Sequence, residues 1–402
     1  MSLHFQRRQF LRGAMGATAI ASLSGPALLR QAARAAEAND DGRILVVLQL
    51  SGGNDGLNTI VPFRDQEYYK QRPQLAIPEA RTLRLTDDHG MHPAMTGLAA
   101  QFEAGRVAVV QGIGYDNPNR SHFESMDIWH SCRRKDQTRT TGWLGRCFDQ
   151  LGSQQGDVPG IHLGEEKQPF ALAAERMAAP SIGQLDNFQL RSREQVTQLV
   201  RDSAAGDSDD SLLSFVKTNA VSALETSRRV REAAERYRST AVYPETALGE
   251  KLRTVAKLIS AGMGTKVYYL TLDGFDTHSE QEGAHASLLR KWSGAVDAFL
   301  RDLESQGSLN RVLLMCFSEF GRRVQENASA GTDHGAAAPA FLIGDPVQGG
   351  IHGRQPSLTD LQQGDLKHHT DFRQLYATVL EKWLKVASEP LLEGKYAPLD
   401  VL

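Results

Sequence analysis

Cysteine is scarce in this chain, which has only three among 402 residues: Cys132, Cys147 and Cys316. So few thiols exclude a small scaffold held together by disulfides, although Cys132 and Cys147 could pair in an oxidising compartment. The odd number leaves at least one thiol free. Cys316 lies in an apolar, strand-like run, where we expect it to be buried and inert.

The chain also has little excess charge, with a net charge of −3 at pH 7. This near balance gives no reason to expect nucleic acid as a partner. Beyond residue 38, no apolar run reaches the roughly 20 residues that a membrane-spanning helix needs. We therefore expect no membrane anchor on the mature protein. Its 41% hydrophobic and 23% charged residues are ordinary for a soluble globular protein.

Residues 1–38 have the pattern of a secretory signal peptide. Arg7 and Arg8 precede an apolar stretch over residues 13–29, which is too short and too polar to hold a bilayer core. The small residues of Ala33-Arg34-Ala35 then offer a cleavage site. Because Arg-Arg-x-Phe-Leu-Arg resembles the twin-arginine consensus, we predict export by the twin-arginine translocase to the periplasm or another extracytoplasmic place. The remaining residues 39–402 are predicted to form a single domain.

Apolar runs alternate with helix-like segments over the rest of the chain. Five nearly continuous runs are typical of buried strands, namely 43–50, 106–111, 266–272, 311–317 and 340–343. Helices are predicted between and after them over 93–104, 211–237, 248–261, 285–303 and 370–384. This alternation predicts an α/β fold in three layers, a mostly parallel sheet between two layers of helices. Residues 153–215, rich in Gln, Ser, Asp and Gly, are predicted to be an insertion over the sheet's edge.

Polar residues gather where the predicted strands end, which is the edge at which such sheets bind ligands. In chain order they are Asn54 and Asp55, then Asn119 to His122, then Asp273, Asp276 and His278, then Glu319, and finally Asp333 and His334. Carboxylates and histidines from several strand ends are the donors that a divalent-metal site needs. Singly, each has a plainer interpretation. Asp55 and Asp273 also suit turns, Glu319 suits a helix start, and His352 suits a loop without a ligand role.

Five motifs occur together in a fixed order: LSGGNDGLN at 50–58, NPNRSHF at 117–123, DGFDTH at 273–278, SEFGR at 318–322 and GTDHG at 331–335. Together they resemble the exported bacterial family named after domain of unknown function 1501. That family resembles a branch of the alkaline phosphatase and sulfatase superfamily. The resemblance implies an alkaline phosphatase-like three-layer fold, divalent metals, and a Ser or Thr nucleophile that acts on phosphate or sulfate esters.

The resemblance also implies roles for the gathered residues. The nucleophile would be Ser121, with Arg120 and His122 beside it, while Asn54 and Asn119 would contact the substrate. The metal ligands would come from Asp55, Asp273, Asp276, His278, Glu319, Asp333 and His334, and the metal would be Zn, Mn, Mg or Ca. Two positions depart from the superfamily pattern. Phe320 replaces a histidine of an Asp-His-Gly motif, and Ser51 stands where the first metal-binding Asp is expected.

The sequence therefore predicts a periplasmic, metal-dependent hydrolase whose substrate is a small-molecule or glycan ester of phosphate or sulfate. The two departures leave a one-metal site open. They also leave open an alternative of a different class, a protein that has lost turnover and serves as an exported binding or assembly protein. A Ser-His-Asp esterase is disfavoured, because no Gly-x-Ser-x-Gly elbow surrounds Ser121.

Overall fold

The computed structural model describes residues 42–152, 158–183 and 237–402. The predicted signal peptide lies outside these residues, as do most of the predicted helix over 211–237 and much of the segment 153–215. The chain divides into the units Met1–Arg43 and Ile44–Leu402, and all the described helices and strands lie in the second.

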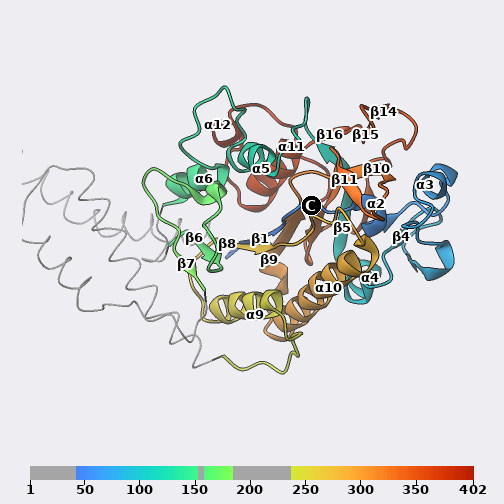
Figure 1. Cartoon of the computed structure of the whole chain (residues 1–402). Coiled ribbons are helices and arrows are strands. Elements are labelled where there is room, and N and C mark those ends of the chain that lie inside the picture. Colours follow the sequence, from blue (N-terminus) through green and yellow to red (C-terminus); the bar gives the residue numbers. More distant parts are fainter. Residues whose placement is uncertain (1–41, 153–157, 184–236) are drawn as a thin grey trace, which may run out of the picture. The chain divides into compact units, whose positions relative to one another are not determined.

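A nine-stranded sheet forms the centre of this unit, in the order β13-β5-β12-β9-β1-β8-β6-β7, with β16 also paired to β5 (Figure 1). Its strands are β1 (Ile44–Leu50), β5 (Val107–Gly114), β6 (Gly160–Leu163), β7 (Ser181–Ile182), β8 (Val267–Leu272), β9 (Val312–Phe317), β12 (Ala338–Ile343), β13 (Gly350–His352) and β16 (Thr370–Asp371). Only β12 runs antiparallel to its neighbours within this sheet. All five predicted strands are present, and the mostly parallel sheet is confirmed.

The central strand β1 shows why these runs are continuously apolar. Val46 and Leu48 contribute to one hydrophobic core, while Leu45 and Val47 contribute to another. Successive side chains of a strand point to opposite faces, so both faces of the sheet are covered.

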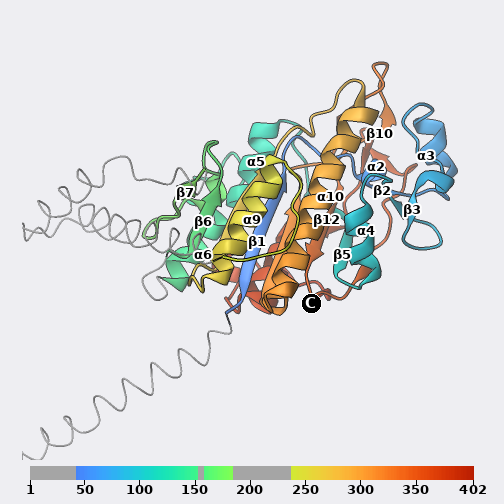
Figure 2. The same ribbon diagram turned by 90° about the horizontal axis from the view of Figure 1, so that it is seen from below.

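Helices form the two outer layers. One face carries α4 (Thr96–Glu103), α9 (Ala247–Ser260) and α10 (Gln281–Ser305), and Figure 2 shows α9 and α10 lying along the sheet. The other face carries α5 (His122–Ser131), α6 (Trp143–Leu151), α11 (Phe372–Ala377), the π-helical η4 (Thr378–Trp383) and α12 (Glu389–Leu392). The predicted three-layer α/β/α architecture is confirmed. The helix predicted over 370–384 is divided into β16, α11 and η4.

Of the predicted insertion over 153–215, the structure describes residues 158–183, and these differ from the expectation. β6 pairs in parallel with β8, and β7 pairs in parallel with β6, so this segment extends the sheet instead of lying over its edge. These strands have four and two residues. Such short strands carry too few residues for a recognisable alternation, and polar neighbours obscure them.

Short elements surround the carboxyl edge of the sheet. The strands β10 (Arg322–Glu326) and β11 (Thr332–His334) form one hairpin, and β14 (Leu361–Gln362) and β15 (Asp365–Leu366) form another. The remaining elements are α2 (Gly56–Thr59), β2 (Ile60–Val61), α3 (Gln66–Gln71), η1 (Glu79–Arg81), β3 (Leu83–Arg84), β4 (Gly90–Met91), η2 (Phe170–Leu172) and η3 (Leu309–Arg311). A third, smaller apolar cluster joins α2, α3 and the two hairpins.

Cys132, Cys147 and Cys316 are all buried and free, so the pairing between Cys132 and Cys147 that the sequence left open is not formed. Among the described residues, no helix has the length and apolar character needed to cross a membrane.

Candidate metal centre

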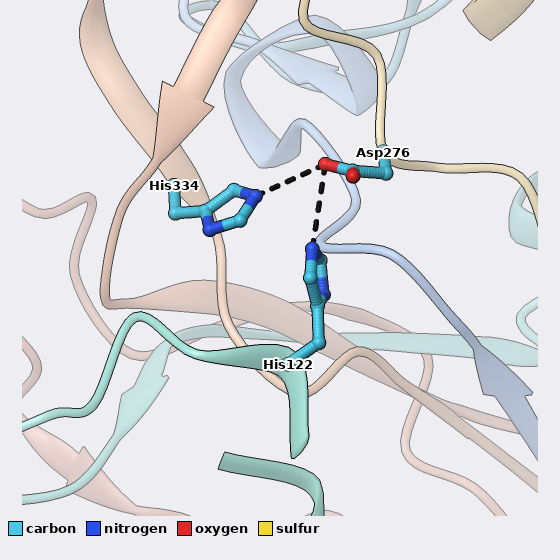
Figure 3. A group of neighbouring side chains, drawn as sticks. All are labelled: His122, Asp276 and His334. Atoms are coloured by element: carbon cyan, nitrogen blue, oxygen red, sulfur yellow. Dashed lines mark hydrogen bonds and ion pairs between the residues drawn. The ribbon is translucent and has the colours of Figure 1, made fainter. Parts of the chain in front are cut away.

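Three side chains from distant parts of the chain meet at the carboxyl edge of the sheet. They are His122 at the start of α5, Asp276 in the loop after β8, and His334 at the end of β11, and each brings one ligand atom to within 4.8 Å of the others (Figure 3). The Nε2 atoms of His334 and His122 lie 3.0 Å and 3.4 Å from Oδ1 of Asp276. We call these three residues the central triad.

His278 lies directly beside the central triad. Its Nε2 atom is 3.0 Å from Oδ1 of Asp276 and 2.9 Å from Nε2 of His334. Two imidazole nitrogens this close need a proton between them or a shared cation, because two lone pairs repel each other. On its other side, Nδ1 of His278 lies 3.3 Å from Oδ1 of Asp333. Asp333 is therefore placed to orient the His278 ring.

His122 is oriented by Glu319, which follows β9. Nδ1 of His122 lies 2.8 Å from Oε1 of Glu319, and the same oxygen accepts a hydrogen bond of 2.9 Å from the backbone of Gly52. The hydrogen bond to Glu319 outweighs burial and raises the pKa of His122. A carboxylate accepts only, so Nδ1 carries the proton whether or not the ring is charged, and in the neutral ring Nε2 presents its lone pair.

That Nε2 atom is buried and has no hydrogen-bond partner. Buried polar atoms in folded proteins are rarely left in this condition. An imidazole that gives one N–H to a carboxylate and leaves the other nitrogen free is the arrangement of a metal-binding histidine with its orienting partner. The residues present therefore fit a cation.

Arg322 forms an ion pair with the carboxylate of Asp276. Its side chain is fully buried, and Nη2 lies 2.7 Å from Oδ1 of Asp276. Other guanidinium nitrogens donate to the backbone oxygens of Gly53 and Thr332 at 2.6 Å and 2.8 Å. Burial alone would raise the pKa of Asp276, but hydrogen bonds from Arg322 and His334 outweigh it, and the pKa is lowered. Asp276 is thus kept ionised.

Phe320 fills one side of the central triad. Its ring centroid lies 4.8 Å from that of His122 and 4.8 Å from that of His334. At this position the superfamily pattern predicts a histidine. The phenyl ring supplies packing there and no ligand atom.

The segment that carries the predicted nucleophile is tied to the central triad through its backbone. The carbonyl oxygen of Arg120 lies 2.7 Å from Nδ1 of His334. Ser121 is exposed, precedes α5 at the N-cap position and makes no capping hydrogen bond with its side chain. Asn119 accepts a hydrogen bond of 2.8 Å from the backbone of Ser121, and Arg120 donates one of 2.8 Å to Asp365.

Three predicted site residues lie in other interactions. Asp55 is buried in an ion pair of 2.6 Å with Arg72 and caps α2. Asn54 is buried and its side-chain oxygen lies 2.9 Å from Nε2 of His285. Asp273 is exposed and accepts a hydrogen bond of 2.8 Å from the next residue, as in a local turn. The structure does not bring these side chains into the central triad.

Arg322 and Asp365 matter to the site, and the sequence interpretation assigned neither a role. Arg322 stands in the motif SEFGR, so an arginine just after a buried strand was the available signal. Asp365 lies in a polar hairpin without any such signal.

The donor set suits a transition-metal ion. Ligand atoms about 2.0–2.2 Å from a tetrahedral ion lie roughly 3.3–3.6 Å from each other. Two contacts in the central triad measure 3.0 Å and 3.4 Å, and all three ligand atoms lie within 4.8 Å of one another. Two or three imidazoles with one carboxylate suit Zn²⁺ and suit Mg²⁺ or Ca²⁺ poorly, since those ions prefer oxygen donors.

Fold and site together define an α/β/α protein with a candidate divalent-metal centre at the carboxyl edge of its sheet. The chain belongs to the family described as "Protein of unknown function (DUF1501)", whose sequence pattern matches residues 43–389. The resemblance to that family seen in the five motifs is confirmed. A comparison with curated proteins finds no match.

Comparison with solved structures finds several that have low overall similarity to this chain. A sulfatase from Pseudoalteromonas sp., PsFucS1, has a TM-score of 0.39 and 13% sequence identity, over 89% of this chain and 70% of that one. A protein in the alkaline phosphatase superfamily from Vibrio parahaemolyticus has a TM-score of 0.42 and 9% identity, over 88% of this chain and 69% of that one. The C-terminal periplasmic domain of EcEptC from Escherichia coli, in complex with Zn, has a TM-score of 0.35 and 10% identity, over 76% and 73% of the two chains.

Proposed function

We propose that this chain is a metal-dependent hydrolase of phosphate or sulfate esters that acts outside the cytoplasmic membrane. The observation that carries the proposal is the buried Nε2 atom of His122, which has no hydrogen-bond partner and lies 3.4 Å from Oδ1 of Asp276. The other nitrogen of the same ring contacts Glu319. A histidine oriented in this way toward a carboxylate and a second histidine supports metal binding.

Each residue of the site has a role in this proposal. His122, Asp276 and His334 would hold the cation, and His278 lies close enough to add a fourth ligand. When bound, a divalent cation polarises ester oxygens and stabilises the charge that develops on them. Arg322 keeps Asp276 ionised, while Glu319 and Asp333 fix the rings of His122 and His278.

We assign the nucleophile to Ser121. Its side chain is exposed, it is next in the chain to His122, and it has no capping hydrogen bond to give up. A free serine hydroxyl is a weak nucleophile and needs an activating group nearby, which the adjacent metal centre would supply. Arg120 lies one residue before Ser121, and its guanidinium is paired with Asp365 at 2.7 Å. An anionic ester would therefore have to compete with that carboxylate for the paired contacts that a guanidinium can offer.

The test is a combined measurement of metal content and turnover. Protein purified from the periplasm should contain about one equivalent of metal per chain and should hydrolyse 4-nitrophenyl phosphate or 4-nitrophenyl sulfate. His334→Ala should lose both the metal and the turnover. Metal-loaded protein that is inert on a broad panel of phosphate, sulfate and phosphonate esters would exclude the hydrolase.

Phe320 favours a second candidate, an exported binding or assembly protein. Its ring packs against His122 and His334 and contributes no donor atom at a position where a second ligand set would need one. A protein with stoichiometric metal but no turnover is the result that this candidate predicts, and the same two measurements therefore separate the candidates.

The place of action rests on the sequence of residues 1–38. We propose that the paired Arg7 and Arg8 direct the chain to the twin-arginine translocase and that the mature protein is periplasmic.

A further inference from the structure

A polar hollow lies beside the central triad. One of its lining residues, Arg120, also contacts His334 of the triad. It is lined by residues 117–120, by Ala336, and by residues 362, 363 and 365–368. Arg120 joins the hollow to the metal centre, because its backbone oxygen contacts His334 while its side chain lines the hollow. Ala336 comes two residues after His334. We call this space the amide hollow.

Carboxamides dominate the lining of the amide hollow. Asn117, Asn119, Gln362 and Gln363 all line it, and all four are exposed. A carboxamide offers both donors and an acceptor, so it can satisfy a hydroxyl group in either direction. The apolar contribution is small, from Pro118, Ala336 and Leu366. Such a lining suits a ligand rich in hydroxyl groups and suits an aliphatic or lipid chain poorly.

The amide hollow also has a surplus of positive charge. Arg120 is balanced by Asp365, a buried lining residue whose carboxylate lies 2.7 Å from the guanidinium. Lys367 lines the hollow too, but its ionic partner Asp360 does not, and both members of that pair are largely exposed. An exposed ion pair of this kind is worth little, so Lys367 can exchange Asp360 for a ligand anion at small cost.

We propose that the amide hollow holds the part of the substrate that is not hydrolysed, and that this part is a carbohydrate bearing a second anionic group. The proposal rests on the proposed function, since the ester to be cleaved is assigned to the metal centre. The four carboxamides bind sugar hydroxyls, and Lys367 binds the second sulfate, phosphate or carboxylate. The preferred substrate is therefore a polyanionic glycan rather than a simple monoester.

Binding of matched disaccharides tests the proposal independently of turnover. The probes are a disulfated disaccharide, the same disaccharide with one sulfate, and the form without sulfate, titrated calorimetrically against metal-loaded protein. Wild type should bind the disulfated probe roughly three- to tenfold more tightly than the monosulfated probe, as expected for one added charge-assisted contact. Raising the salt concentration should reduce this difference.

Two variants locate the effect. Lys367→Gln should remove the preference for the second sulfate while leaving the rate on 4-nitrophenyl esters unchanged. Gln362→Ala should lower the affinity for all three disaccharide probes by the same factor. The matched control is Lys70→Gln, because Lys70 on α3 is likewise exposed and paired with a carboxylate, yet lies outside the amide hollow. It should leave every affinity unchanged.

The outcomes also separate this proposal from the function on which it rests. If wild type hydrolyses 4-nitrophenyl esters but Lys367→Gln keeps the full preference, the amide hollow is not the glycan site, and the hydrolase stands. If none of the probes binds, the amide hollow is likewise excluded. If the probes bind with the predicted preference while no ester is hydrolysed, the glycan site in the amide hollow is supported and the proposed hydrolase activity is contradicted.

Discussion

Glu319 and His122, which are 197 positions apart in the chain, meet at 2.8 Å between Oε1 and Nδ1. This contact decides which nitrogen of His122 faces Asp276. The candidate metal centre therefore depends on a residue that need not touch a metal ion. A change at Glu319 is the first test of that centre.

Glu319→Gln should weaken metal binding by about 10- to 100-fold, as is typical when the orienting partner of a ligand histidine is changed. A glutamine can present its amide to Nδ1, which favours the tautomer with the proton on Nε2 and so removes the free lone pair. Competition with a chromophoric chelator measures the affinity. Glu304→Gln, at a surface carboxylate paired with Arg106, is the matched control and should change nothing. Equal affinities in the two variants would show that Glu319 does not orient a ligand.

Metal should stabilise the folded protein through His334. Adding Zn²⁺ should raise the melting temperature of wild type and chelator should lower it, because a ligand that binds only the folded state stabilises it by mass action. His334→Ala should abolish this response. A response that survives in His334→Ala would place the cation elsewhere in the chain. Circular dichroism at several metal concentrations is a sufficient measurement.

Ser121→Ala should abolish ester turnover while leaving the fold and the metal content intact. Because Ser121 is exposed and makes no capping hydrogen bond, its removal should cost less than about 1 kcal/mol of unfolding free energy. Loss of activity with unchanged melting and metal content would then be a catalytic effect. Activity above half that of wild type would remove Ser121 from the mechanism.

The buried ion pair between Asp55 and Arg72 predicts a pH-dependent part of the stability. Burial alone would raise the pKa of Asp55, but the charge and hydrogen bond of Arg72 outweigh it and lower the pKa. A carboxyl group with a lowered pKa in the folded state stabilises the fold fully above its unfolded value of about 3.9 and loses that contribution as the pH falls further.

Asp55→Asn should therefore destabilise the protein at pH 7 by about 3–5 kcal/mol, since it leaves the Arg72 charge buried without a counter-ion. The difference from wild type should shrink as the pH falls below about 4, because the unfolded chain then binds a proton at Asp55 while the folded protein still keeps that carboxylate ionised. Urea unfolding at pH 7 and at pH 3 gives the two values. A difference that stays constant between them would contradict the assignment.

Replacing Arg7 and Arg8 by Lys should leave precursor in the cytoplasm, because guanidinium and ammonium differ in geometry and the twin-arginine receptor reads the arginine pair. Fractionation of cells followed by immunoblotting measures the distribution. If the Lys-Lys form reaches the periplasm as efficiently as wild type, the proposed route is wrong.

Much of the fold could be predicted because its strands are buried on both faces. The run over 43–50 became β1, and the apolar stripe over 285–303 became the core-facing side of α10. The short strand β6 could not be predicted, because its pairing with β8 depends on residues that lie about a hundred positions later.

The candidate site, like the fold, could be predicted from the sequence only in part. Asp276, His278 and His334 were predicted because acids and histidines follow strand ends, and the structure brings them together. His122 was predicted as a neighbour of Ser121, and its contact with Glu319 has no local signal in the sequence. Asp55 looked like a metal ligand because it follows β1, yet its carboxylate is bound to Arg72, which stands 17 positions later.

The two outer edges of the central sheet influence whether copies of the folded chain pair with one another. Among the strands of the described residues, the outermost on one side is β7, which has two residues, and those on the other are β13 and β16, which have three and two. Short outermost strands present few consecutive backbone groups, so a neighbouring copy finds little template for intermolecular pairing. We propose that the chain is exported already folded, and outermost strands this short would help it to stay dispersed in the cytoplasm until then.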